Sequence, residues 1–163
     1  MLQEKILRNI ARNSRISTED LAAMLSASPE EIREAVAQME KDGVICGYPT
    51  LINWDRIDAE RVTALIELKV TPERGRGFDR AAERIYQFDE VESLYLMSGG
   101  GFDLTVIVHG RSMKEVARFV ATKLAPMDDI ESTATHFVLK KYKEYGLSLG
   151  QRKTRDERQL ITP

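Results

Sequence analysis

The chain has 163 residues, of which 42% are hydrophobic and 31% charged, with a formal net charge of -2. This composition is typical of a soluble globular protein, and the length suits two small domains. No apolar run approaches the roughly 18 residues that span a bilayer, and the start of the chain lacks the features of a signal peptide, so we expect a cytoplasmic protein without a membrane partner. The single cysteine, Cys46, excludes an intramolecular disulfide and a multi-cysteine metal cluster, and we expect it to be a small buried hydrophobe.

Charge is unevenly distributed along the chain. Residues 140–163 hold seven Lys or Arg against three Asp or Glu, a local excess of +4, whereas the other residues sum to about -6. A net acidic protein has no overall electrostatic attraction to DNA, so DNA binding would depend on locally placed cations and on two or more binding heads acting together. Residues 146–163 are predicted to form a basic tail.

Three helix-sized segments open the chain. The first is expected over residues 2–12, because apolar side chains share one helical face at Leu2, Ile6, Leu7 and Ile10. The second begins at a capping arrangement over residues 17–20. Its predicted buried face consists of Leu21, Met24 and Leu25.

The third segment has the strongest start signal. Ser28 is a helix-capping residue, Pro29 suits the first helical position, and Glu31 completes a capping box. The helix is expected to end at Gly43, which can adopt the left-handed conformation of a C-cap. Only residues 26–28 separate the second helix from the third, which is the spacing of a helix-turn-helix.

Two short β-type runs follow the third helix, at residues 44–48 and 51–53. They predict a wing, broken by Gly47 and Pro49. Residues 1–52 are therefore predicted to form a winged helix-turn-helix DNA-binding domain. A small helical interaction domain is the alternative for the same pattern.

From Val62 onward the pattern changes to alternating apolar and polar residues, which predicts a strand over residues 62–71. Helices are then expected over residues 78–88 and from the capping box at Ser112 to Pro126, with strands at 91–97, 104–108 and 130–142. This order predicts an α+β chain in which residues 62–145 form a ferredoxin-like βαββαβ effector domain, joined to the head by a solvated linker at 53–61. One sheet face would be left open, so a second copy is expected to cover it.

The turn between the two central strands is the candidate ligand site. Its glycines leave backbone N–H groups unshielded, an acid beyond them can pair with an ammonium group, and two threonines of the last strand can supply hydroxyls. The candidate residues are Gly99, Gly100, Gly101, Asp103, Thr133 and Thr135. Together they could hold both ends of an amino acid. The alternative is that the glycines only permit a sharp turn.

Several runs of residues carry a family resemblance by their order and spacing. They are Ile16-Ser17, Asp20-Leu21-Ala22, Ser28-Pro29, the run from Met39 to Tyr48, the run from Ser98 to Leu104, and the run from Ser132 to Thr135. Over about residues 2–145 the chain resembles the Lrp/AsnC (feast/famine) family of transcriptional regulators. The resemblance implies a head that binds double-stranded DNA, an effector domain that forms homodimers and often octamers, and amino acids bound between dimers.

The third helix departs from the family pattern, because Ala35 stands where many members carry an arginine and acids lie at the start of the helix. Glu30 and Glu31 either contact cytosine or only stabilise the helix N-terminus. Arg33 and Gln38 can read guanine or adenine edges, while phosphates would be held by cations and by the wing. The candidate DNA-binding residues are Arg12, Arg15, Ser28, Glu30, Arg33, Glu34, Gln38, Lys41, Tyr48 and Thr50.

Two rival classes stay open at this point. The chain has only two histidines, His109 and His136, and no HExxH, Walker A or GxSxG motif, so we expect no enzyme, no metal and no cofactor. Siroheme decarboxylases, however, resemble the same architecture, and binding of a tetrapyrrole would distinguish them. The other alternative is a sensor or interaction module without DNA affinity, which the acidic third helix suggests.

Overall fold

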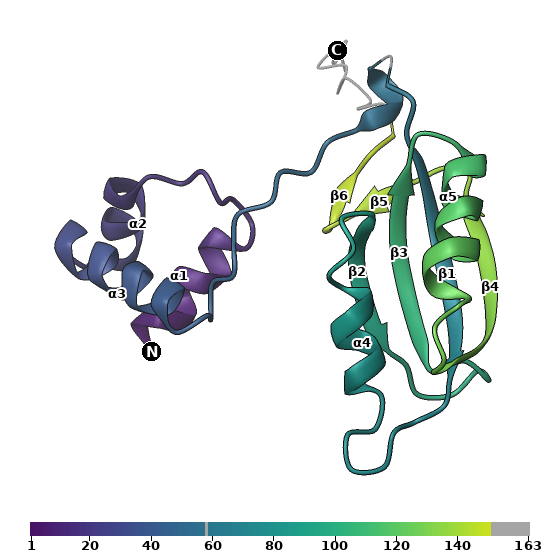
Figure 1. Cartoon of the computed structure of the whole chain (residues 1–163). Helices are drawn as coiled ribbons and strands as arrows, with labels where there is room; N and C mark the ends of the chain where they lie inside the picture. Colours follow the sequence, from purple (N-terminus) through teal and green to yellow (C-terminus); the bar gives the residue numbers. More distant parts are fainter. Residues whose placement is uncertain (58, 151–163) are drawn as a thin grey trace, which may run out of the picture. The chain divides into compact units, whose positions relative to one another are not determined.

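The structure, a computed structural model, describes residues 1–57 and 59–150 (Figure 1). The chain divides into two units, Met1–Leu51 and the part from Ile52 onward. The predicted basic tail lies outside the described residues from position 151. None of the helices in the described part of the chain has the length and apolar character needed to cross a membrane.

The first unit consists of three helices, α1 (Leu2–Ile10), α2 (Thr18–Leu25) and α3 (Pro29–Lys41). Their shared core is made of Ile6, Leu21, Ala22, Ile32 and Met39. The prediction for Met24 was wrong, because its side chain is 62% exposed. At 100° per residue, positions 21, 22 and 25 share the inner face of α2 and position 24 points away from it.

The turn between α2 and α3 is short and well capped. Ser26 adopts the left-handed conformation, with φ 54°, and ends α2. The hydroxyl of Ser28 accepts a hydrogen bond from the Glu31 N–H at 3.2 Å, and the Glu31 carboxylate accepts one from the Ser28 N–H at 2.7 Å. The predicted capping box is therefore confirmed, and it fixes where α3 begins.

The segment after α3 differs from its prediction. Residues 44–53 form no strand within the described chain. Gly47 and Pro49 interrupt the run, and a strand this short has no neighbour with which to pair. The prediction that Cys46 is buried was also wrong, since its side chain is exposed.

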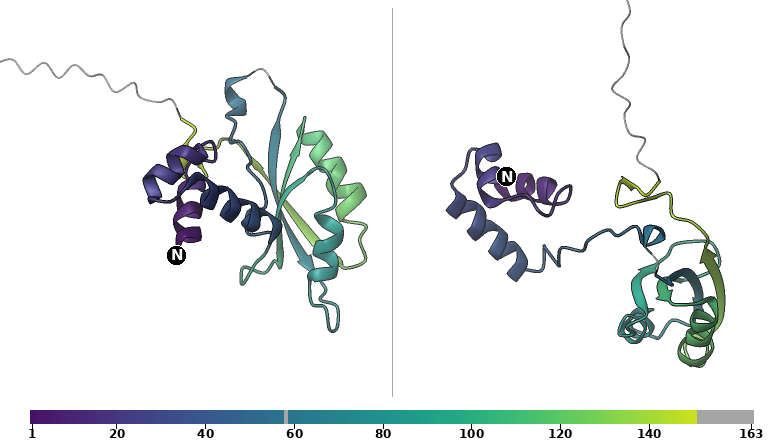
Figure 2. Two further views of the ribbon diagram at one scale, coloured as in Figure 1. Left: turned by 90° about the vertical axis from the view of Figure 1, so that its left-hand side faces the viewer. Right: turned by 90° about the horizontal axis from the view of Figure 1, so that it is seen from above.

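The second unit contains a four-stranded antiparallel sheet in the order β2-β3-β1-β4 (Figures 1 and 2). The strands are β1 (Val62–Val70), β2 (Val91–Leu96), β3 (Leu104–Gly110) and β4 (Ile130–Val138). Helices α4 (Asp79–Ile85) and α5 (Met113–Phe119) lie on one face of the sheet, and α5 continues into a π-helical turn, η2 (Val120–Leu124). The predicted βαββαβ order is confirmed, although α4 and β4 are shorter than expected.

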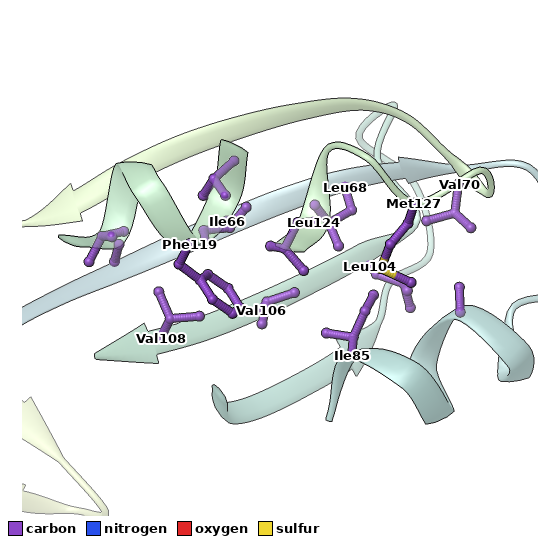
Figure 3. Close-up of a cluster of buried hydrophobic side chains, with 14 residues drawn as sticks. Ile66, Leu68, Val70, Ile85, Leu104, Val106, Val108, Phe119, Leu124 and Met127 are labelled. Carbon is purple, nitrogen blue, oxygen red and sulfur yellow. The ribbon is translucent and has the colours of Figure 1, made fainter. Parts of the chain in front are cut away.

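The core of this unit lies between the sheet and the two helices (Figure 3). Ile66 and Leu68 of β1 face Val106 and Leu104 of β3, while Phe119 packs edge-on against Phe88 with ring centroids 5.6 Å apart. The other core side chains are Ala64, Val70, Ala81, Ile85, Val108, Val116, Val120, Leu124 and Met127.

The opposite face of the sheet carries the alternate residues of each strand. Leu65 lies at its centre, opposite Ile107 of β3 on one side and His136 of β4 on the other. Tyr95 of β2 is 53% exposed. Helices α4 and α5 both lie on the other side of the sheet and leave this face uncovered, as Figure 2 illustrates.

Two features of this unit were not predicted. Residues 53–61, expected to be a solvated linker, include a short 3-10 helix, η1 (Trp54–Arg56), and the guanidinium of Arg61 lies 4.6 Å from the centre of the Trp54 ring. After β4 the chain forms a small hairpin of β5 (Lys143–Glu144) and β6 (Leu147–Ser148). The side-chain amide of Asn53 donates to the Leu149 carbonyl at 2.7 Å, which ties the linker to this hairpin.

Candidate DNA-binding and effector sites

Helix α3 presents a mixed polar surface opposite its buried side chains. Ile32 and Met39 define the inner side, so the helical period places Glu30, Glu34 and Lys41 on the outer side. Arg33 and Gln38 lie on either flank of this outer side, and both are exposed. The predicted base-reading residues are thus brought together on one exposed helix surface.

Local hydrogen bonds partly occupy that surface. The Arg33 guanidinium donates to the Glu30 carboxylate at 3.0 Å, and the Gln38 amide donates to Asp42 at 2.7 Å. A hydrogen bond to its own backbone N–H, followed by the contact with Arg33, lowers the pKa of Glu30. The backbone N–H and then the hydroxyl of Ser28 lower the pKa of Glu31. Glu31 therefore stabilises the helix start, and Arg33 forms an exposed ion pair with Glu30 on the surface of α3.

The candidate phosphate contacts are spread around α3. Arg12 and Arg15 are exposed in the turn after α1, and Lys41 is exposed in the last turn of α3. The Ser28 hydroxyl already serves the capping box. Thr50 is exposed in the extended segment that follows α3.

Tyr48 has a partner that the sequence did not reveal. Its hydroxyl donates a hydrogen bond to the Glu40 carboxylate at 2.7 Å. That hydrogen bond, aided by partial burial, raises the pKa of the Tyr48 phenol. Tyr48 is thus fixed to α3 by its side chain.

The candidate effector turn joins β2 to β3. Gly99, Gly100 and Gly101 have φ angles of 93°, 83° and 84°, which side chains other than glycine rarely adopt. The turn is closed by a hydrogen bond of 2.8 Å from the Met97 N–H to the Asp103 carbonyl. The glycines are therefore required by the turn itself, and their N–H groups are also unshielded by side chains.

Asp103 is already engaged within the protein. Its carboxylate accepts a hydrogen bond from the Val70 N–H at 2.9 Å and lies 3.2 Å from the Lys69 ammonium. The Val70 N–H and, to a lesser extent, Lys69 lower the pKa of Asp103 against the opposing effect of desolvation. Lys69 was not a predicted site residue, because this contact joins residues far apart in the sequence.

The two threonines lie apart from the glycine turn. Thr133 pairs with Leu68 and Thr135 with Ile66 across the β1–β4 ladder. Both threonines therefore lie on the helix-covered side, while β1 separates their strand from β3. The structure brings the glycines and Asp103 together at one end of the sheet but does not bring the threonines next to them.

A cavity of about 480 Å³ lies at the other end of the sheet, where β1 begins and β3 ends. Its lining includes Trp54, Arg61, His109 and Arg111. Sequence reasoning missed it, because the lining residues come from several short segments that carry no common motif.

Both histidines have polar partners in the sheet. His109 Nδ1 lies 3.0 Å from the Thr63 hydroxyl, and His109 Nε2 contacts the Glu92 carboxylate. Burial lowers the pKa of His109, although Glu92 opposes this effect. His136 Nε2 lies 2.9 Å from a Glu67 carboxylate oxygen. These contacts account for both histidines as structural residues of the sheet.

Comparison with known proteins agrees with this architecture. Residues 2–45 match the model of a winged helix-turn-helix DNA-binding domain, and residues 63–147 match the Lrp/AsnC ligand binding domain. The chain is 49% identical over 145 residues to an HTH-type transcriptional regulator, YugG, of Bacillus subtilis, covering 88% of this chain and 87% of the relative. It is 31% identical over 142 residues to the leucine-responsive regulatory protein of Haemophilus influenzae, covering 86% and 83%.

Solved structures share the fold. A transcriptional regulator of Neisseria meningitidis in complex with L-Met is similar with a TM-score of 0.67 and 22% identity, over 88% of this chain and 91% of that chain. A DNA-binding head followed by a ligand-binding βαββαβ domain defines a transcriptional regulator. The chain belongs to the Lrp/AsnC family, and its relatives are regulators rather than enzymes.

Proposed function

We propose that this regulator works in the cytoplasm as a homodimer that can assemble further into an octamer. Its paired heads bind DNA half-sites, and its effector domain responds to an amino acid. The observation that carries the proposal is that one chain has both an exposed, capped α3 and an uncovered sheet face. The first feature suits a DNA groove, and the second suits a symmetric partner.

The sheet face opposite the helices is the proposed dimer surface. Leu65, Ile107 and Ala134 provide its half-buried apolar centre, and Tyr95 extends it on β2. In an isologous interface the same surface of both subunits is in contact, so the dimer would bury this central patch on each of the two copies. Homodimerisation supplies the second head that a net acidic chain needs to bind DNA firmly.

At the DNA, α3 is proposed to enter the major groove. Arg33 and Gln38 on its flanks would contact base edges, and Arg12, Arg15 and Lys41 would contact phosphates. The acids on α3 make each head a weak binder on its own. Two heads would read half-sites about 34 Å apart, or a multiple of that distance.

For the effector we propose an amino acid at the β2–β3 turn. The unshielded N–H groups of Gly99, Gly100 and Gly101 would bind its carboxylate. Asp103 would receive its ammonium group, which then replaces the Lys69 ammonium as the ion-pair partner. Thr133 and Thr135 remain candidates only for contact with a ligand that is shared with another subunit. The named relative that responds to leucine and the neighbour bound to L-Met support this ligand class.

Selection of genomic DNA fragments by the purified protein tests the proposal, when repeated with and without a pool of amino acids. We expect retention of a small set of fragments, and a change in the retained set or in its affinity when the effector is present. Retention of no fragment at low salt by an intact oligomer would favour an interaction module instead. A coloured tetrapyrrole bound by the purified protein would favour the decarboxylase alternative.

A further inference from the structure

The chain that follows α3 is extended and is held by few backbone contacts. The N–H groups of Val44 and Ile45 still donate to the Met39 carbonyl, at 2.9 and 3.1 Å. Within the described chain, residues 46–52 make no backbone-to-backbone hydrogen bond. The N–H groups of Gly47 and Thr50 are therefore free to bind an external acceptor.

A side chain ties this segment to the helix. The Tyr48 hydroxyl donates to Glu40 at 2.7 Å, and Glu40 is a residue of the last turns of α3. Tyr48 is 44% exposed, so more than half of the side chain is covered. It borders a groove of about 220 Å³ whose lining includes Ile10, Ile16 and Val36. We call the Tyr48–Glu40 hydrogen bond the Tyr48 tether.

We propose that Tyr48 is a positioning residue for DNA binding: the Tyr48 tether holds residues 46–50 beside α3, in place of a wing hairpin, so that their free N–H groups meet a DNA phosphate. Backbone N–H groups commonly bind DNA phosphates. Such contacts fix the position of the protein on the duplex without distinguishing between base sequences. Gly47 has open space around the position of a Cβ, which leaves room for a close approach. The inference rests on the proposed entry of α3 into the DNA groove.

A double-mutant cycle distinguishes this indirect role from direct contact between the Tyr48 hydroxyl and DNA. Tyr48→Phe removes only the hydroxyl, and Glu40→Ala removes only its acceptor. The probe is a duplex recovered from the genomic selection, titrated by fluorescence anisotropy. We expect Tyr48→Phe to weaken binding about fivefold, the worth of one modest hydrogen bond. In the Glu40→Ala background the same change should have no further effect.

Two results of the cycle would overturn the proposal. An equal loss from Tyr48→Phe in both backgrounds would mean that the hydroxyl contacts DNA directly. Undiminished binding by Tyr48→Phe in the otherwise unchanged protein would mean that the tether plays no part. Tyr142→Phe is the matched control, because Tyr142 is an exposed tyrosine of the second unit. The DNA-binding curve of the Tyr142→Phe protein should be the same as that of the wild type.

The single cysteine gives a readout without DNA. Cys46 is exposed and lies two residues from Tyr48, so a nitroxide attached to it reports on this segment by electron paramagnetic resonance. Tyr48→Phe and Glu40→Ala should both narrow the spectrum, and Tyr142→Phe should leave it unchanged. A spectrum insensitive to Tyr48→Phe would refute the tether. Failure of the unlabelled wild-type protein to bind any fragment would instead refute the proposed function.

Discussion

Replacing Leu65 by glutamate should separate the proposed dimer without unfolding the subunit. Leu65 lies on the uncovered face of β1, so in a single subunit the new carboxylate can remain hydrated. In the dimer it would be buried near its symmetry mate and close to Glu67, which faces the same side two residues further along the strand.

The magnitude follows from the number of charges buried. The effective penalty for burying an unpaired ion in a protein is several kcal/mol, and the symmetric interface buries two. Even about 4 kcal/mol in total weakens the dimer roughly a thousandfold. Leu65→Ala is the matched control, because it removes apolar contact without adding charge and should cost less than the glutamate.

Sedimentation velocity over a range of protein concentrations measures this effect. We expect Leu65→Glu to sediment as a monomer with unchanged circular dichroism, and Leu65→Ala to dimerise more weakly than the wild type. A Leu65→Glu protein that stays dimeric at micromolar concentration would refute the assignment of this sheet face to the interface.

Three further substitutions give predictions for the DNA-binding head and the effector turn. Ser28→Ala should lower the free energy of unfolding of the head by about 1 kcal/mol, since half of the capping box is lost, and a thermal melt that does not shift would contradict this. Arg33→Ala should weaken binding to a selected duplex more than to unrelated DNA, and equal losses in a competition titration would make Arg33 a phosphate contact only. Asp103→Asn keeps an acceptor for the Val70 N–H but loses the charge, so it should abolish the amino-acid response and leave the dimer intact. Because the pKa of Asp103 is lowered in the folded protein, the charged carboxylate stabilises the fold at a pH above the ordinary aspartate pKa. This contribution is lost as the pH falls through the lowered pKa. The free energy of unfolding of Asp103→Asn should therefore decrease less steeply than that of the wild type as the pH is lowered through that range.

The features predicted well from sequence are those set by local chemistry. The capping box at Ser28 and Glu31 depends on residues three positions apart, and it fixed the start of α3 correctly. The order of helices and strands in the second unit follows from the periodicity of apolar residues, because each strand buries one face against α4 or α5. These signals lie within single segments, so the sequence contains them in full.

The features that were missed depend on contacts between distant segments. The runs at 44–48 and 51–53 have β-type residues, but a strand also needs a partner, and the described chain offers none there. The sequence could not reveal that Asp103, in the turn before β3, is held by Lys69 and Val70 of β1. Nor could it reveal that Thr133 and Thr135 are separated from the glycine turn, because this depends on the strand order of the sheet.

Hydroxyl-radical footprinting on a selected DNA fragment tests most directly whether paired heads read paired half-sites. We expect the wild-type protein to protect two patches on one side of the duplex, with centres about 34 Å apart or a multiple of that distance. The Leu65→Glu protein should give neither patch at the same concentration. One isolated patch for the wild type, or equal protection by both proteins, would contradict the account.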